Sequence, residues 1–316
     1  MAGRVAVTGA TGFVGSHLVR RLCASGWQVR ILARRMPTMA LNPGTPIELV
    51  LGDLDDAEAL KLLISGVDTV VHVAGIVKAH RAADFHTVNV EGSRHLAEVI
   101  AAAGRSLRVI HVSSLAAREP RLSPYARSKR AGEDAMAPLA GRHALTILRP
   151  PAVYGPGDAE ILPMFKAAAA GFFPYPAPRG ARVSLIHVSD LAGAMQTVLE
   201  APSLPEPLYE LEDGHAGGYA WPEIIAALST ALERPIQAFR LPRPAMQVIA
   251  AGAEWHRRFG GPLTALCRDK LAEIYHADWA AHGPSLADRT GWRPTYSLVD
   301  GFRHTIAWYR AQGRLR

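Results

Sequence analysis

A glycine-rich turn near the N-terminus constrains the fold of this chain more than any other feature. Residues 4–9 read RVAVTG, a short apolar run typical of a buried strand, and an amphipathic helical pattern follows over 13–26. Between them, Gly9, Gly12 and Gly15 are spaced G-x-x-G-x-x-G. Such a strand–turn–helix lets backbone approach a pyrophosphate closely and aims free helix N–H groups at it. A purely structural turn is the alternative, but the position on a strand–turn–helix favours a dinucleotide site.

Apolar runs and helical patterns alternate through the first half of the chain. Further strands are expected at 27–34, 47–53, 67–75, 107–114 and 144–150, and further helices at 56–66 and 85–104. This alternation indicates βαβ units with right-handed crossovers and a parallel sheet covered on both faces. The predicted fold class is α/β: a Rossmann-type doubly wound parallel sheet with a smaller C-terminal α+β substrate lobe.

The regular alternation breaks after Pro150, and this break sets the predicted domain boundary. Residues 1–150 are expected to form the dinucleotide-binding domain, and 183–201, read as strand then helix, to rejoin it. Residues 151–182 and 202–316 are expected to form the substrate lobe. Within that lobe two Pro- and Gly-rich stretches are expected to be loops, 171–182 and 202–220.

Composition limits the class of protein and its compartment. Apolar residues make up 49% of the 316 residues, which supports a large packed core. The two cysteines, Cys23 and Cys267, lie far apart without metal-ligand spacing, so we predict neither a disulfide framework nor a metal site. No signal peptide and no apolar run of about 18 residues is recognised, which predicts a cytoplasmic protein. The net charge of +7 has two interpretations: a solvated basic surface, or a surface that attracts an anionic cofactor or membrane. No nucleic-acid-binding module is recognised in the sequence.

The end of the second strand predicts the choice of cofactor. An acidic residue there usually accepts from the ribose 2′-hydroxyl of NAD, but this chain has Ala33 followed by Arg34 and Arg35. A forked guanidinium matches a 2′-phosphate in charge and geometry. We therefore predict NADP in preference to NAD, the alternative being that the arginines face solvent. Asp53 and Leu54, after the third strand, are expected at the adenine.

A tyrosine and a lysine one helical turn apart, Tyr125 and Lys129, are candidates for proton transfer. Reduction of a carbonyl needs a proton donor at the forming alkoxide, but the pKa of a free tyrosine is about 10. A lysine at i+4 brings positive charge towards the phenol and lowers that pKa. HVSS, at the end of a predicted strand, offers Ser113 and Ser114 as hydroxyl donors to the substrate oxygen. Alone, the pair would more often be a solvated helix face.

Several motifs occur together and in a fixed order: TGATGFVG, GDL, HVAG, NVEG, VSS, Y-x-x-x-K, RPPAVYGPGD and a closing TGWRPTYSLVDGFRHTIAWYR. As a set they resemble the extended short-chain dehydrogenase/reductase superfamily over nearly the whole chain. The resemblance implies catalytic roles for Ser114, Tyr125 and Lys129. Asn89 is expected to hold a backbone group or water near the site, or to be a surface amide. The residues expected at the cofactor are Gly9, Thr11, Gly12, Phe13, Val14, Gly15, Arg34, Arg35, Asp53, Leu54, Val73, Ala74, Gly75, Ser113, Tyr125, Lys129, Pro150 and Val153.

The substrate is constrained by departures from the sugar-nucleotide members of that superfamily. Ala152 stands before VYGP where those members usually carry asparagine, and Leu115 and Ala116 replace the acidic pair of dehydratases. Arg182 argues the other way, because it stands where those enzymes often bind phosphate. Apolar residues of the C-terminal half predict a hydrophobic pocket or the core of the lobe itself: Phe165, Phe172, Phe173, Tyr175, Met246, Val248, Ile249, Trp255 and Phe259.

The sequence therefore predicts an NADP(H)-dependent oxidoreductase that acts on a hydrophobic, lipid- or sterol-like β-keto or hydroxy substrate. The overall pattern is similar to 3β-hydroxysteroid dehydrogenase-like, dihydroflavonol reductase-like and bacterial ceramide reductase-like members. A nucleotide-sugar epimerase and a non-catalytic NADP-binding subunit stay open as alternatives. A basic amphipathic stretch with Arg257, Arg258, Arg268 and Lys270 would allow peripheral membrane contact. A homodimer through the helices after the fourth and fifth strands is also left open.

Overall fold

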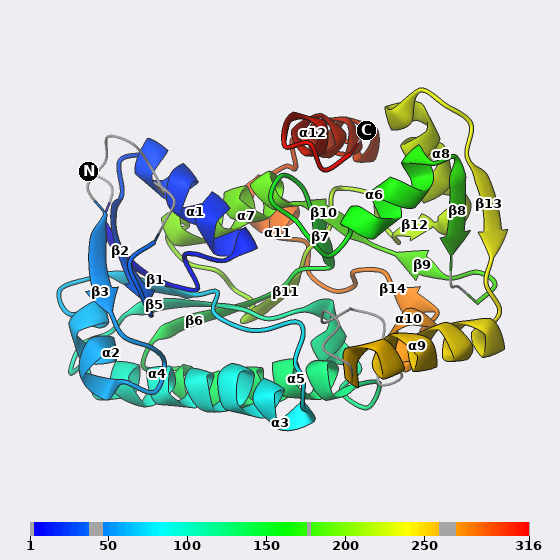
Figure 1. Ribbon diagram of the computed structural model, residues 1–316. Helices are drawn as coiled ribbons and strands as arrows, with labels where there is room; N and C mark the ends of the chain where they lie inside the picture. The colour runs from blue at the N-terminus through cyan, green and yellow to red at the C-terminus, as the bar shows by residue number, and fades with distance from the viewer. Residues whose placement is uncertain (1–2, 38–46, 176–177, 259–269, 316) are drawn as a thin grey trace.

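A parallel seven-stranded sheet forms the centre of the molecule (Figure 1). The computed structural model describes residues 3–37, 47–175, 178–258 and 270–315. The strand order is β11-β6-β5-β4-β1-β2-β3, and every neighbouring pair is parallel. The strands are β1 (Arg4–Thr8), β2 (Gln28–Ala33), β3 (Glu48–Leu51), β4 (Thr69–His72), β5 (Arg108–Val112), β6 (Ala144–Arg149) and β11 (Leu208–Glu210). The order reverses between β1 and β4, which confirms the predicted doubly wound α/β class.

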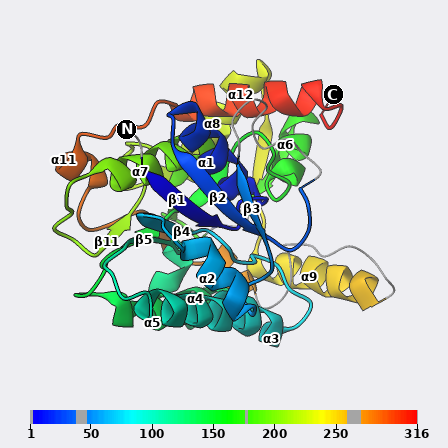
Figure 2. The same cartoon turned by 90° about the vertical axis from the view of Figure 1, so that its left-hand side faces the viewer.

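Helices cover both faces of this sheet (Figure 2). α1 (Phe13–Ala24) and α7 (Val188–Glu200) pack together on one face. The other face carries α2 (Ala57–Ile64), α4 (Gly92–Ala101) and α5 (Pro124–Met136). Because successive strand residues point to opposite faces, Val5 and Val7 join the first core and Ala6 the second.

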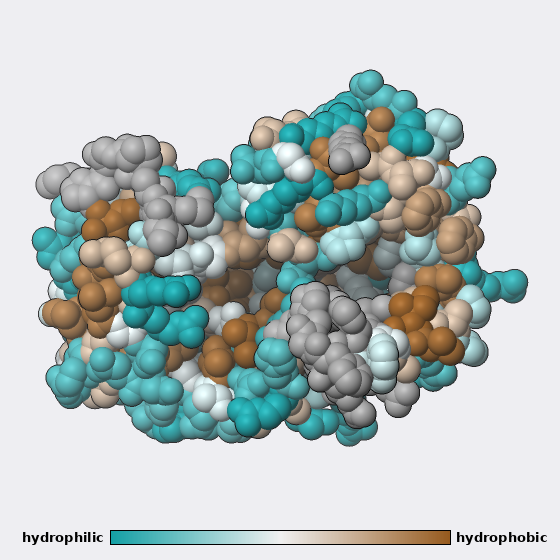
Figure 3. Space-filling model, viewed as in Figure 1, coloured by the Kyte–Doolittle hydropathy of each residue, from teal (hydrophilic) through white to brown (hydrophobic). Residues whose placement is uncertain are grey.

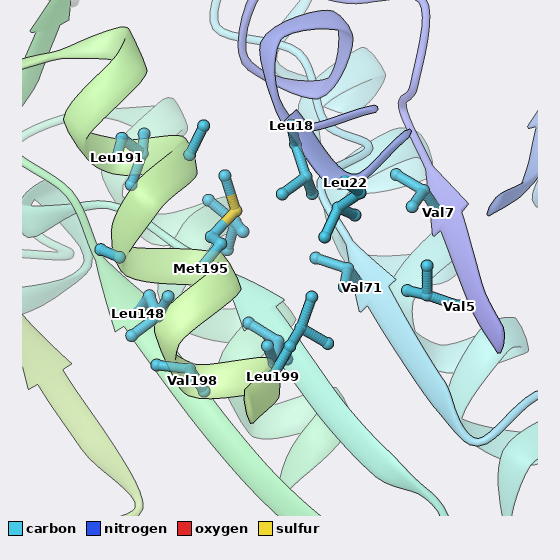
Figure 4. Close-up of a cluster of buried hydrophobic side chains, with 14 of the residues drawn as sticks. Val5, Val7, Leu18, Leu22, Val71, Leu148, Leu191, Met195, Val198 and Leu199 are labelled. Atoms are coloured by element: carbon cyan, nitrogen blue, oxygen red, sulfur yellow. The ribbon is translucent and has the colours of Figure 1, made fainter. Parts of the chain in front are cut away.

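The core beneath α1 and α7 holds the glycine-rich turn in place (Figure 4). Leu18 and Leu22 of α1 meet Leu191 and Met195 of α7, all fully buried, over the apolar strands. Burial of one such side chain contributes about 1.5–3 kcal/mol. The helix that begins at the turn is therefore anchored along its whole length.

Two segments after Pro150 differ from prediction. The strand of 183–201, β10 (Leu185–His187), does not join the main sheet but pairs with β7 (Ala152–Tyr154). The seventh strand, β11, lies in 202–220, which was wrongly predicted as loop throughout. β11 is three residues long and preceded by Pro207, so periodicity carried no signal; its pairing with β6 buries Tyr209 completely.

The lobe is a mixture of short strands and helices beside the main sheet (Figure 1). Its strands are β8 (Phe172–Tyr175), β9 (Arg182–Val183), β12 (Tyr219–Ala220), β13 (Gln237–Arg240) and β14 (Asp278–Trp279). Its helices are α6 (Leu162–Ala169), α8 (Trp221–Leu232), α9 (Arg243–Arg258), α10 (Leu271–Ile274) and α12 (Leu298–Ala311). α11 (Leu286–Thr290) instead packs against α7, where Leu286 joins the core of the main sheet. β8 lies within 171–182, so the prediction of a loop there was wrong for these four residues.

The lobe has its own core, which settles the place of several aromatic residues. Phe165 and Phe173 are buried there with Phe302 and Tyr309, so they are core residues rather than pocket lining. Phe172 is exposed, and Phe259 lies outside the described residues. None of the described helices has the length and apolar character needed to cross a membrane.

Candidate active site

A cleft of about 1000 Å³ runs along the carboxyl ends of the central strands and under the lobe. Figure 3 shows the hollow on the face of the molecule between the two halves. Every residue predicted at the cofactor or the proton-transfer site lines this cleft except Arg35, which is exposed outside it. Residues 100 positions apart in the sequence thus meet at the reversal of strand order, where doubly wound sheets bind ligands.

The glycine turn at one end of the cleft has no room for side chains. Gly9 adopts φ +70°, and a Cβ there would lie 2.6 Å from the backbone nitrogen of Ala74. A Cβ on Gly15 would lie 2.1 Å from the carbonyl oxygen of Gly9. The turn is closed by Gly12 N–H, which donates to Gly9 O at 3.0 Å, and α1 begins directly after it. These residues fit a dinucleotide, whose pyrophosphate would lie against the exposed N–H groups.

The two arginines after β2 occupy different places. Ala33 is buried at the strand end, Arg34 lines the cleft and is exposed, and Arg35 does not reach the cleft. Of the predicted pair, only Arg34 is therefore placed for a ribose phosphate. After β3, Asp53 accepts from the N–H of Asp55 at 3.0 Å while it lines the cleft.

The first turn of α5 presents Tyr125 to the cleft. Ser123 caps this helix by accepting from Ala126 N–H at 2.9 Å, and Pro124 occupies its first position, a strong helix-start signal. Burial raises the pKa of Tyr125 to about 12, a hydrogen bond with Ser114 lowers it, and the Glu273 carboxylate raises it. Ser114 and Tyr125 thus interact where both line the cleft. A carbonyl oxygen could accept from both hydroxyls there.

Lys129 lies one turn further along α5 and is 7% exposed. Its Nζ donates to the carbonyl oxygen of Val112 at 2.9 Å, and a Cβ on Gly75 would lie 3.7 Å from it. Desolvation lowers the pKa of Lys129 to about 8, and the Glu133 carboxylate acts in the opposite sense. Near neutral pH this lysine is a cation held below the cleft, available to favour the phenolate of Tyr125.

The side chain of Asn89 is buried and forms hydrogen bonds with backbone groups, so it is not a surface amide. Its Oδ1 accepts from Ile76 N–H at 2.8 Å, and its Nδ2 donates to Ile76 O at 3.0 Å and to Ser128 Oγ at 2.9 Å. It lies in a π-helical segment, His86–Glu91, and such segments often mark functional sites. Asn89 thereby ties the chain after β4 to α5.

A buried ionic group below the strand ends escaped the sequence reasoning. Ser113 Oγ donates to Glu133 at 2.5 Å, and Arg149 binds both oxygens of Glu133 at 2.7 and 2.8 Å. Arg149 also lies 3.4 Å from Glu210 of β11. Ser113, which also lines the cleft, is therefore bonded to Glu133, whereas Ser114 is the serine that interacts with the phenol. The pairing of β11 with β6 brings Glu210 to Arg149, and the packing of α5 on β5 and β6 brings Glu133 to both Ser113 and Arg149, so no local pattern predicts the group.

The lobe contributes a second wall that the sequence did not indicate as functional. Val183, Ser184, Lys270, Glu273 and Trp279 line the cleft there. The Lys270 ammonium lies 4.8 Å from the centre of the Tyr125 ring. The predicted phosphate-binding residue Arg182 does not line the cleft; its Nη1 lies 3.2 Å from Glu223 Oε2.

The chain belongs to the NAD dependent epimerase/dehydratase family, whose sequence pattern matches residues 5–208. It is thus an NAD(P)-dependent enzyme of the extended short-chain dehydrogenase/reductase type, as the motifs indicated.

Individual relatives span different activities. The chain is 42% identical to a ceramide reductase of Caulobacter vibrioides, over 99% of this chain and 96% of that one. It is 26% identical to a UDP-glucose 4-epimerase of Vibrio cholerae, over 99% and 98% of the two chains. The solved UDP-glucose 4-epimerase of Bifidobacterium longum, in complex with NAD+ and UDP, superposes with a TM-score of 0.73 at 19% identity, over 98% of this chain and 99% of that one. At that identity the solved structure supports the fold alone.

Proposed function

We propose that this enzyme reduces a carbonyl group on a hydrophobic, lipid-like β-keto substrate with NADPH, or oxidises the corresponding alcohol with NADP+. The observation that carries the proposal is that Ser114, Tyr125 and Lys129 line one cleft together with the glycine turn and residues of the lobe. A substrate of the ceramide class fits best, because the relative at 42% identity over 99% of this chain is a ceramide reductase.

The roles of the three side chains follow from their positions. The nicotinamide ring supplies the hydride when NADPH is bound. Tyr125 donates its phenolic proton to the carbonyl oxygen, so that a carbonyl becomes an alcohol and the tyrosine a phenolate. Ser114 donates a hydrogen bond to the same oxygen, and the cation of Lys129 favours the phenolate, which solvent then reprotonates.

Arg34 supports NADP over NAD. Its side chain lines the cleft beyond the end of β2, and the buried Ala33 leaves no carboxylate there to bind a ribose hydroxyl or repel a phosphate. Family membership by itself covers both cofactors.

The lining of the cleft supports an apolar substrate. The apolar residues that line the cleft include Ile76, Val77, Leu115, Ala116, Pro151, Ala159, Ile161, Val183 and Trp279, beside the charged Asp158, Glu160, Lys270 and Glu273. A sugar nucleotide would need groups that bind its phosphates, but Arg182 lies outside the cleft beside Glu223. These features favour a hydrophobic substrate with one polar reacting centre.

The test is NADPH oxidation with purified protein across long-chain β-keto amides, steroid ketones and UDP-sugars. Turnover of the long-chain compounds is the expected result. The second candidate, a nucleotide-sugar epimerase, is favoured by the 26% identity to an epimerase over 99% of this chain. Turnover of UDP-sugars alone, without net NADPH oxidation, would establish that candidate instead.

We also propose that α9 touches an anionic lipid surface. Met246 and Ala250 pack against Leu271, while Val248 and Ile249 are 73% and 47% exposed on the same helix. Figure 3 shows apolar residues gathered over α9. Arg243 is exposed at its start; the side chains of Arg257 and Arg258 and all of Arg268 lie outside what the structure describes.

Vesicle sedimentation tests this contact. Binding to phosphatidylglycerol vesicles, but not to phosphatidylcholine vesicles, is expected, and Val248→Glu should abolish it. Equal recovery of wild type and variant with both vesicles would contradict the contact.

The homodimer through α4 and α5 stays a prediction, which light scattering of the purified protein can test by measuring its mass.

A further inference from the structure

We infer that Lys270 and Glu273, a charged pair from the C-terminal lobe, position Tyr125 and set how readily its phenol releases a proton. The inference rests on the proposed role of Tyr125 as the proton donor. It adds two residues that act through the tyrosine, from a part of the chain that follows the nucleotide-binding domain.

The cation lies over the tyrosine ring itself. Lys270 Nζ is 4.8 Å from the centre of the Tyr125 ring and 3.5 Å from Glu273 Oε2. The Lys270 side chain is 27% exposed, so water screens its charge only in part. At this separation and in a partly buried site, a positive charge stabilises a phenolate more than a neutral phenol.

Glu273 connects the lobe to the first turn of α5. The residue is 6% exposed, and its Oε1 accepts from the hydroxyl of Ser123, the residue that caps α5. Its backbone oxygen accepts from Trp279 Nε1 at 2.9 Å. The lobe therefore holds the turn that carries Tyr125, two residues beyond the cap.

The two charges act on the tyrosine in opposite directions. The Glu273 carboxylate raises the pKa of Tyr125. From its place over the ring, we expect the Lys270 cation to act in the opposite sense, because a positive charge attracts a phenolate. Lys129, one turn further along α5, also lines the cleft, with its Nζ on the carbonyl oxygen of Val112. The neutral neighbours of Tyr125 are Ser114 and Phe85. A pair whose charges oppose each other gives a balance that a change in either one alone would disturb.

The matched variants are Lys270→Met, Lys270→Arg and Glu273→Gln, each made with and without Tyr125→Phe. The protein is labelled with meta-fluorotyrosine, which titrates at lower pH than tyrosine, and the Tyr125 resonance is identified by its loss in Tyr125→Phe. Its titration is then followed by fluorine NMR in the NADP+ complex. This measurement needs no substrate and no turnover.

Lys270→Met should raise the titration midpoint by about one pH unit, and Glu273→Gln should lower it by a similar amount. Lys270→Arg keeps the charge and should stay close to wild type. Thermal unfolding and NADP+ binding identify any variant that fails to fold. A midpoint unmoved in Lys270→Met, a shift of both neutral variants in one direction, or an arginine variant that behaves like methionine would overturn the inference.

The outcome of this titration can be distinguished from the outcome of the test of the proposed function. If the midpoints move as expected but no carbonyl compound is reduced, the function fails and the control of the phenol stands. If a carbonyl compound is reduced but the midpoints do not move, the pair is a structural tie between lobe and helix.

Discussion

The two walls of the cleft are built in different ways. The wall at the glycine turn is made of backbone: Gly9, Gly12 and Gly15 leave N–H groups at the surface, and their spacing along 4–15 suffices to specify it. The wall under the lobe is made of side chains from β9, α10 and β14, including Lys270 and Trp279. The first wall tolerates no added atom, whereas the second is a set of contacts that substitution can adjust one at a time. This difference suits a site that keeps one cofactor and adapts to its substrate.

Tyr125→Phe, at the junction of the two walls, should have the largest effect. It removes the proton donor and leaves the ring, so kcat should fall by about 10²–10⁴-fold while NADPH affinity stays close to wild type. Steady-state kinetics and NADPH fluorescence measure the two quantities. Turnover at the wild-type rate would refute the role of the phenol.

Gly15→Ala tests whether the backbone wall is as intolerant as its geometry indicates. The new methyl group would lie 2.1 Å from Gly9 O, so the turn must shift and NADPH affinity should fall by about 100-fold or more. Gly252→Ala is the matched control, since no atom lies within 4 Å of its Cβ position in α9. Calorimetric titration with NADPH measures the affinity of both variants. Equal affinities would mean that the glycine turn does not bind the cofactor.

Arg34→Ala should separate the two cofactors. Loss of one charged contact to a 2′-phosphate should weaken NADPH by about 10–100-fold and leave NADH almost unchanged. Arg35→Ala, whose side chain lies outside the cleft, is the control and should change neither. A parallel loss for NADPH and NADH in Arg34→Ala would contradict the selection of NADP.

The smallest expected effect concerns stability. Lys129→Met should lose activity, and it should also change the free energy of unfolding by a small amount. Burial depresses the pKa of Lys129 from 10.5 to about 8, so the unfolded chain binds more protons than the folded one between these values. Wild-type stability is therefore lowest below about pH 8 and rises towards pH 10.5. Lys129→Met should be more stable than wild type by about 1–2 kcal/mol near neutrality, and the gain should shrink as the pH rises. Urea unfolding near neutral pH and near pH 10.5 measures this difference in the free energy of unfolding. A variant less stable than wild type at neutral pH would show that the hydrogen bond to Val112 O outweighs the cost of desolvating the lysine.

The sequence located residues of the cleft where a local pattern marks them. The glycine turn, Arg34, the strand-end serines and the i, i+4 pair Tyr125 and Lys129 each occupy a short segment with its own signature. It failed where the partner is distant. β11 was missed because three residues show no period, and the Ser113–Glu133–Arg149–Glu210 chain exists only once β11 pairs with β6.

By itself, then, the sequence determined the α/β class and the glycine turn between strand and helix, and it predicted the groups for proton transfer, because periodicity and spacing act within a few residues. The tertiary structure alone decided that Arg35 and Arg182 stay outside the cleft and that Lys270 and Glu273 reach Tyr125. Contacts between residues about 150 positions apart depend on how the lobe packs against α5, and no local spacing encodes that packing.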